Sequence, residues 1–166
     1  MKPPGDQLLR LIGTMLATKY IPILESDHGK SELGLTALVL GVIAEEFERA
    51  AHTRIVENME MRKIFKQAIP VVSDDGLKNR LAEASEKIEV DFHTSALDQL
   101  NSDLHKVLIE LHEHVENLEG AAAKDLEEAI WLELEKHVKR REFMTWAVAA
   151  AMLTSATQSD TETAGE

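Results

Sequence analysis

Leucines that recur at intervals of seven residues constrain the fold of this chain more than any other feature. The repeat consists of Leu97, Leu104, Leu111 and Leu118, with Leu108 and Val115 at the companion positions and Asn101 as the polar exception. Such a spacing forms the seam of a helix whose side chains pack knobs-into-holes against another helix. We therefore expect a helix over residues 96–119, ended by Gly120, with a seam that faces either a neighbouring helix or a second subunit.

Apolar residues recur with a period of about 3.6 through most of the remaining chain, which predicts further helices. A first helix is expected over residues 6–24, kinked or ended by Pro22, with a loop over residues 26–29. A third helix follows the turn at residues 73–76 and points the apolar residues between Leu77 and Phe92 inward.

The second expected helix is long and central to the fold. It spans residues 31–69, with Ser31 as its N-cap and Pro70 as its stop. Its first part, residues 33–44, is apolar on all sides, and such a helix is usually buried between neighbours. We therefore predict an all-α fold, a bundle of four to five helices, largely antiparallel, around this long central helix.

The remaining boundaries follow from caps and composition. Ser95, with Asp98 three residues later, resembles a capping box before the leucine helix. A fifth helix is expected from residue 121 or 124 to residue 153. Residues 154–166 are polar and are expected to form a disordered C-terminal tail, so that a single helical-bundle domain is predicted over residues 1–153.

Charge and composition exclude several classes of partner. The net charge is -12, whereas binding to nucleic acids and anionic membranes needs clustered basic residues. The strongest apolar run, residues 143–153, is too short to cross a bilayer, because a helical span takes about 20 residues. The chain contains no cysteine, which excludes disulfides and thiolate metal sites. We expect a cytoplasmic protein that binds neither nucleic acid nor membrane.

Carboxylates and histidines on one helix face are the first candidates for a metal site. Glu45, Glu48 and His52 lie close together on the long helix, and Glu45 and His52 project in nearly the same direction. Di-iron bundles hold their metals with acids and histidines that project inward, although they use a Glu-x-x-His spacing rather than pairs four residues apart. The favoured alternative is that Arg49, Arg54 or a lysine pairs with the acids.

His105, His112 and Glu116 form a second candidate set beside the leucine seam. The two histidines are seven residues apart. Two helical turns separate them by about 10–11 Å, which is too far for one metal unless the side chains converge. Polar contacts to a partner helix are the favoured alternative. No cofactor is therefore predicted, and a divalent metal is the alternative.

Protein–protein contact is the other kind of site that the patterns indicate. The interface candidates are the seam residues Leu97, Leu104, Leu111 and Leu118, together with Trp131. A basic cluster at residues 136–141 suits an acidic partner. The sequence has no Gly-rich phosphate loop, nucleophile elbow, HExxH motif or EF-hand loop, and a non-enzymatic role is therefore favoured.

Four stretches of the sequence carry a resemblance to a known group. They are LLRLI at residues 8–12, IAEEFERAA at 43–51, LIELH at 108–112, and AIW with EL between 129 and 134. In these stretches the chain resembles small uncharacterised bacterial helical proteins, whose genes tend to lie beside those of acyl-CoA dehydrogenases and aminoglycoside-phosphotransferase-like kinases. The resemblance implies a helical, cytoplasmic accessory protein in acyl-CoA or related catabolism, with no catalytic residues to transfer.

The sequence therefore predicts a non-enzymatic helical accessory or interaction protein. It would act as a homo-oligomer or as a small partner subunit in acyl-CoA-related catabolism. The alternative is a metal-binding helical bundle of the di-metal, ferritin-like kind. A pocket between helices for a small apolar ligand, such as an acyl group, is a third interpretation.

Overall fold

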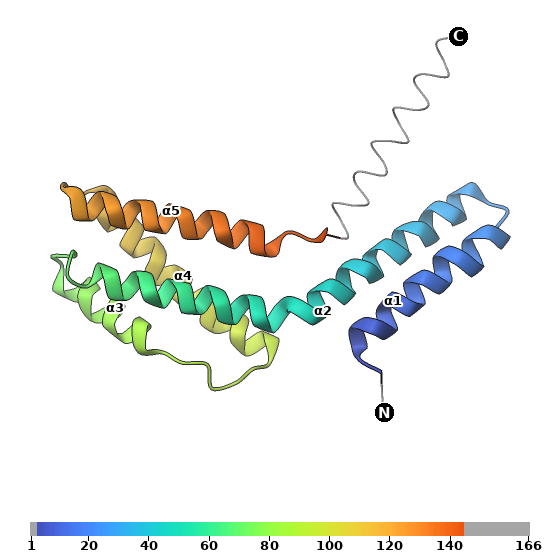
Figure 1. The fold of residues 1–166 in the computed structure, drawn as a ribbon, viewed down its shortest axis with the longest axis horizontal. Helices are drawn as coiled ribbons and strands as arrows, with labels where there is room; N and C mark the ends of the chain where they lie inside the picture. Colours follow the sequence, from blue (N-terminus) through green and yellow to red (C-terminus); the bar gives the residue numbers. More distant parts are fainter. Residues whose placement is uncertain (1–2, 145–166) are drawn as a thin grey trace, which may run out of the picture. The chain divides into compact units, whose positions relative to one another are not determined.

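The protein is built from helices throughout the part of the chain that the structure describes. A computed structural model describes residues 3–144 and contains no strand in that range (Figure 1). Its α-helices are α1 (Gly5–Met15), α2 (Asp27–Ala68), α3 (Asp75–Glu86), α4 (Thr94–Glu116) and α5 (Ala121–Arg141). The predicted all-α bundle around one long helix is confirmed, because α2 packs against the other helices.

The chain divides into two compact units that share α2. One comprises Met1–Arg49 with Phe143–Glu166, and we call it the hairpin unit because α1 runs back along the first part of α2 (Figure 1). The other, Ala50–Glu142, is the core unit and contains the rest of α2 with α3, α4 and α5. The predicted tail, residues 154–166, and residues 145–153 of the apolar run lie outside the described residues.

A close approach at Gly13 holds the hairpin together. Gly13 is the buried residue of α1. A Cβ atom at this position would lie 3.2 Å from the carbonyl oxygen of Ala37 and 3.7 Å from Cβ of Leu40. The Phe47 ring covers Gly5 in a similar way, 2.8 Å from the position of a Cβ atom. The missing side chains of two glycines therefore set the spacing of α1 and α2.

The turn of the hairpin is made of irregular helix. Leu16–Tyr20 form a π-helix after α1, and Ile21–Ile23 form one 3-10 turn. Pro22 lies in that turn, and the backbone becomes extended at Leu24. Helical backbone therefore ends one residue after Pro22, as predicted, because proline cannot donate the next helical hydrogen bond, but α1 itself is shorter than predicted and ends at Met15.

The predicted start of the long helix is wrong by four residues. α2 begins at Asp27, inside the predicted loop, and the Ser26 hydroxyl accepts a hydrogen bond from the Gly29 N–H at 3.2 Å. Ser31 lies inside the helix, where its hydroxyl donates to the Asp27 carbonyl at 3.0 Å. Ser26 rather than Ser31 therefore caps the helix. The N–H groups of the first helical turn follow Ser26 directly and have no carbonyl partner within the helix.

The core unit has one continuous apolar core to which all four of its helices contribute. The core residues are Met61, Ile64, Phe65 and Ala68 of α2, Val72 of the following turn, Leu77, Leu81 and Ala84 of α3, Leu104, Leu108, Leu111 and Val115 of α4, and Leu126 and Ile130 of α5. Four amphipathic helices therefore enclose their apolar stripes within this unit.

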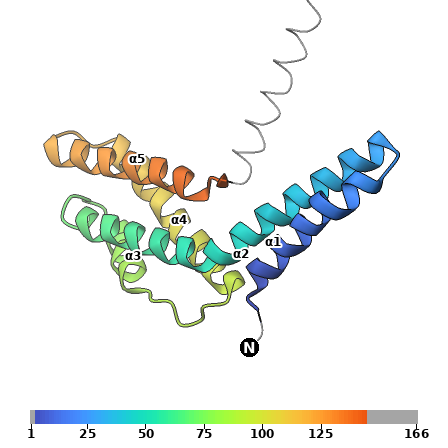
Figure 2. The same ribbon diagram turned by 45° about the vertical axis from the view of Figure 1, so that its right-hand side comes forward.

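Residues 87–93 form an extended connection between α3 and α4 (Figure 2). The prediction that the third helix continues inward to Phe92 is therefore wrong, and Ile88 and Phe92 are 72% and 64% exposed. Arg62 of α2 donates from Nη1 to the Lys87 carbonyl oxygen at 2.8 Å. This bond satisfies the carbonyl oxygen where the helix stops, in place of a further helical turn.

The two ends of α4 also differ from the prediction. The expected capping box is wrong, because no side chain caps α4 and Asp98, three residues after Ser95, accepts from Arg54 Nε at 2.7 Å instead. α4 ends at Glu116, and Gly120 occupies the turn before α5 with a φ of 115°. That left-handed conformation favours glycine, which explains its place in the turn.

The fifth helix is shorter than predicted. α5 ends at Arg141, where Glu142 adopts an extended backbone, instead of continuing to residue 153. Val138, near its end, is 62% exposed. Among residues 3–144, no helix combines the length and the apolar character needed to cross a membrane.

Candidate functional site

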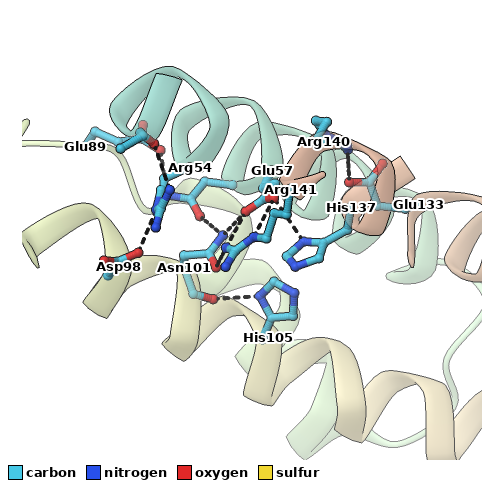
Figure 3. Close-up of polar contacts among 12 residues, drawn as sticks. Arg54, Glu57, Glu89, Asp98, Asn101, His105, Glu133, His137, Arg140 and Arg141 are labelled. Carbon is cyan, nitrogen blue, oxygen red and sulfur yellow. Dashed lines mark hydrogen bonds and ion pairs between the residues drawn. The ribbon is translucent and has the colours of Figure 1, made fainter. Parts of the chain in front are cut away.

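Glu57 on α2 is the most deeply buried charged side chain among residues 3–144, with no exposed surface. Arg141, the last residue of α5, donates from Nε to Oε1 at 3.1 Å and from Nη2 to Oε2 at 2.8 Å (Figure 3). Two parallel bonds of this kind are the strongest pairing between a guanidinium and a carboxylate. The pair joins α5 to α2 and offsets the large cost of burying the carboxylate.

Two asparagines extend this pair into a network that includes α4. Asn101 donates from Nδ2 to Glu57 at 3.2 Å and to Oδ1 of Asn58 at 2.9 Å. Its Oδ1 accepts from Nη2 of Arg141 at 3.2 Å. Asn58 donates in turn to Oε1 of Glu89, in the extended connection, at 3.2 Å. Both asparagines are buried, so these bonds satisfy polar groups that would otherwise be costly to bury.

Two histidines from neighbouring helices lie beside this network. His137 of α5 places Nδ1 3.2 Å from Oε1 of Glu57. His105 of α4 places Nδ1 3.0 Å from the carbonyl oxygen of Asn101. The rings meet edge to face, with their centroids 4.9 Å apart and their planes at 70° (Figure 3). Each ring therefore has one nitrogen anchored by an oxygen atom and one nitrogen left over.

The surroundings of the network set its charge states. Burial lowers the pKa of His137 from its ordinary value, and the cations Arg141 and Arg140 and the ring of His105 add to the lowering, while the carboxylate of Glu57 opposes it. The hydrogen bond to Glu57 raises the pKa of Arg141. At neutral pH the network therefore holds a neutral His137 beside a charged guanidinium.

A second buried carboxylate, Glu133, is paired within α5. Arg140 donates to Oε1 of Glu133 from Nη1 at 3.1 Å and also from Nη2. Burial raises the pKa of Glu133, and the charge of Arg140 opposes the rise. Two arginines of the basic cluster at residues 136–141 are thus paired with buried acids of the same chain, while Lys136 and Lys139 are exposed.

The first predicted metal set is divided between a buried acid and two exposed side chains. Glu45 is 8% exposed, and its Oε1 accepts from Arg49 at 2.6 Å and from the backbone N–H of Met144 at 3.0 Å. Glu48 and His52 are exposed. The alternative of pairing with Arg49 is confirmed for Glu45. Among residues 3–144, no three histidine, aspartate or glutamate side chains gather in a way that could hold a metal.

The second predicted set is also divided. His112 packs edge to face on Trp131, with centroids 5.0 Å apart and planes at 86°, and its Nε2 lies 3.6 Å from Glu116. His105 instead joins the network around Glu57 through Asn101. Trp131, an interface candidate, is 55% exposed and remains accessible to a partner.

The leucine seam belongs to the core of its own chain. Leu97, Leu104 and Leu111 are each at most 1% exposed, and Leu118 is half-buried. The seam therefore packs on neighbouring helices at these three leucines, which leaves no surface for a second subunit there, whereas Leu118 stays an interface candidate. Seven-residue spacing describes the surface of one helix only. The same spacing is therefore found whether the partner helix belongs to the same chain or to a second subunit.

The hairpin unit exposes an apolar surface on two helices. We call it the hairpin face; it consists of Leu8, Leu11, Ile12 and Met15 of α1 with Leu35, Val39, Ile43 and Phe47 of α2, each between 37% and 64% exposed. The prediction that residues 33–44 are buried on all sides is therefore wrong. One neighbour, α1, covers only one side of this part of α2.

No family model, curated protein or solved structure matches this chain.

Sequence reasoning missed the central residues of the network, namely Glu57, Asn58, His137 and Arg141. One signal could have found them. Glu57 and Asn58 continue the stripe of Met61 and Phe65 one turn toward the start of α2. Polar residues at positions that should be apolar point to buried polar contacts, as Asn101 did within the leucine seam.

Proposed function

We propose that this protein is a non-enzymatic helical interaction protein that acts as a homodimer, joined through the hairpin face. The observation that carries the proposal is the exposure of eight large apolar side chains on the two-helix arm. Exposed apolar surfaces of this extent mark sites of protein contact.

The two apolar stripes, one on each helix, are directed toward the same side of the hairpin. At about 100° per residue, the stripe residues on α1 lie about 100–200° around the helix from Gly13, and those on α2 lie about 50–170° from the midpoint of Ala37 and Leu40, where the helices touch. The displacement has the same rotational sense along both sequences. In an antiparallel pair, displacement in the same sense brings both stripes to the same side of the hairpin.

The size of the hairpin face suits a second copy. Burying the exposed half of eight such side chains removes roughly 250–500 Å² of apolar area per copy from water. This approaches the apolar share of the ~800 Å² that each partner contributes to a standard interface. Two hairpins placed face to face would form a four-helix bundle, in which each apolar stripe has a neighbour.

Charge opposes self-association through this unit only weakly. Residues 1–49 contain five basic and seven acidic side chains, whereas the whole chain carries a net charge of -12. Most of the negative charge therefore lies outside the helices that would meet, which keeps the repulsion between two copies small.

The core unit supports a structural rather than a catalytic role. Its buried acids, asparagines and arginines bond to one another, which holds α2, α4 and α5 together. The resemblance to proteins encoded beside acyl-CoA dehydrogenases supports a narrower proposal, that the dimer serves as an accessory protein in acyl-CoA-related catabolism.

Light scattering coupled to size-exclusion chromatography tests the dimer. We expect the full chain to have the mass of two copies, and the double variant Leu11→Glu with Val39→Glu to have the mass of one copy with unchanged helicity. Ile109→Glu is the matched control, because Ile109 is 66% exposed on α4 of the core unit, and it should remain dimeric.

Two outcomes would contradict the proposal. One is a double variant that remains dimeric. The other is a full chain that is monomeric and becomes dimeric when it is truncated after Met144. The second result would show that the apolar run at residues 145–153 of the same chain, rather than a second copy, occupies the hairpin face.

A further inference from the structure

We propose that His105 and His137 together form a binding site for one divalent transition-metal ion, such as Zn²⁺, between α4 and α5. The proposal is independent of the dimer, because both histidines belong to the core unit. It rests on the hydrogen bond that holds Nδ1 of each ring and on the Nε2 atom that remains without a partner among the described residues.

The anchors fix where the protons of the two rings lie. A backbone carbonyl oxygen only accepts hydrogen bonds, so Nδ1 of His105, 3.0 Å from the Asn101 carbonyl, must carry the hydrogen. The same argument places a hydrogen on Nδ1 of His137, which lies 3.2 Å from the carboxylate of Glu57. In a neutral imidazole the remaining nitrogen, Nε2, then carries a lone pair.

The two rings are neighbours, and each has an Nε2 atom without a partner in the described part of the chain. Figure 3 shows the His137 ring pointing toward the ring of His105, and the centroids are 4.9 Å apart. Within residues 3–144, neither Nε2 atom has a hydrogen-bond partner, while both Nδ1 atoms do. Each ring thus offers one neutral nitrogen donor beside the other ring, and imidazole nitrogen is a donor that suits Zn²⁺ and other transition-metal ions.

The anchors also match the surroundings of histidine ligands in metalloproteins. A ligating histidine almost always donates its other ring N–H to a carboxylate or a backbone carbonyl, which fixes the tautomer and the orientation of the ring. His137 has the carboxylate of Glu57 in this position and His105 has the carbonyl of Asn101. Glu57 is in turn held by Arg141, so the anchor itself is rigid.

The electrostatic environment permits a dication. The positive charge of Arg141 is paired with the negative charge of Glu57, so the two rings do not face an unpaired cation from this side chain. Two histidines leave further positions of a tetrahedral Zn²⁺ open for water.

Calorimetric titration of the full-length protein, with any affinity tag removed, tests the site. We expect Zn²⁺ to bind with one ion per chain. We also expect the melting temperature to rise by about 5–10 °C when free Zn²⁺ exceeds its Kd a hundredfold. His105→Gln should weaken binding at least tenfold, with little effect on folding because its anchor is a local backbone carbonyl.

His52→Gln is the matched control, because His52 is an exposed histidine four residues after Glu48 and takes no part in the network. It should bind Zn²⁺ as the unaltered protein does. His137→Gln should also lose binding, and circular dichroism would show that it stays folded. Absence of Zn²⁺ binding by the unaltered protein, or equal binding by His105→Gln, would overturn the proposal, since the second result assigns the metal to other histidines.

Discussion

The two units of this chain bury apolar side chains to very different degrees, although they share one helix. In the core unit, four helices enclose Phe65 and Leu111 with no exposed surface, and even a glutamate is fully buried there. In the hairpin unit, two helices bury little more than Gly13, Ala44 and Glu45. The comparison shows that apolar content does not decide burial; the number of neighbouring helices does.

The largest expected effect is the difference in the free energy of unfolding lost on truncating a side chain in the core unit and in the hairpin unit. Phe65→Ala removes a fully buried ring from the core unit, and we expect it to lower the free energy of unfolding by about 3–5 kcal/mol. Leu11→Ala, at a position that is 55% exposed, should change it by less than about 0.5 kcal/mol in protein dilute enough to be monomeric. Urea unfolding followed by circular dichroism measures both. Equal effects would contradict the difference between the units.

The buried charge gives the next largest effect. Glu57→Ala leaves Arg141 and His137 without their carboxylate, and we expect a loss of about 2–4 kcal/mol, less than for a fully enclosed pair because the Arg141 side chain is 40% exposed. Glu60→Ala is the control on the same helix, and its exposed ion pair with Lys63 should be worth less than about 1 kcal/mol. Thermal unfolding distinguishes the two variants.

A glycine pair tests what holds the hairpin unit together. Gly13→Val should separate α1 from α2 and cost about 1–3 kcal/mol, because a Cβ atom there meets the Ala37 carbonyl oxygen at 3.2 Å. Gly34→Ala has a nearest contact of 3.9 Å to Ile21 and should gain up to about 1 kcal/mol from helix propensity. Hydrogen exchange of the α1 amides measures the separation. A harmless Gly13→Val would show that the helices do not need this close contact.

The smallest expected effect concerns pH and the buried Glu133. Burial raises the pKa of this acid above its value in the unfolded chain, so its contribution to stability falls as pH rises from the unfolded to the folded pKa. Glu133→Gln cannot ionise. Its stability relative to the unaltered protein should therefore increase as pH rises above the pKa of an unfolded glutamate, about 4.3.

An exposed acid on the same helix provides a control of opposite sign. The hydrogen bond from Lys139 lowers the pKa of Glu135. Its contribution is present above the unfolded pKa and is lost as pH falls, so the relative stability of Glu135→Gln should decrease as pH rises. Urea unfolding at several pH values measures both variants. The same sign for both would contradict the assignment of Glu133 as a buried acid with a raised pKa.

The sequence was sufficient for those features of the fold that depend on local pattern. Helix periodicity identified the five α-helices within residues 3–144, and Pro22 and Pro70 lie within two residues of the points where helical backbone ends, at Ile23 and Ala68. The partner of the leucine seam could not be predicted, because a heptad records only the surface of its own helix. The wrong end of the third helix has a non-local cause, since Arg62 of another helix binds the Lys87 carbonyl.

Only one of the two histidines of the candidate metal site could be identified from the sequence. His105 was a candidate because it flanks the seam, whereas His137 is hidden in a run of lysines and arginines that resembles a solvated surface. Only the fold shows that His137 and Arg141, one turn apart, face the same buried carboxylate. Pairing across three helices leaves no regular spacing in the sequence, so pattern analysis has nothing to detect.

The continuity of α2 has a consequence for how the molecule opens. Its 42 residues form one unbroken run of backbone hydrogen bonds, but packing supports that run unevenly along its length. Amides near Phe65 should exchange with solvent only when the whole core unit unfolds, whereas those near Leu35 can exchange through fraying from the first turn. Protection of the α2 amides against hydrogen exchange should therefore rise from Leu35 to Phe65. Binding at the hairpin face should raise the protection near Leu35 and so reduce this difference.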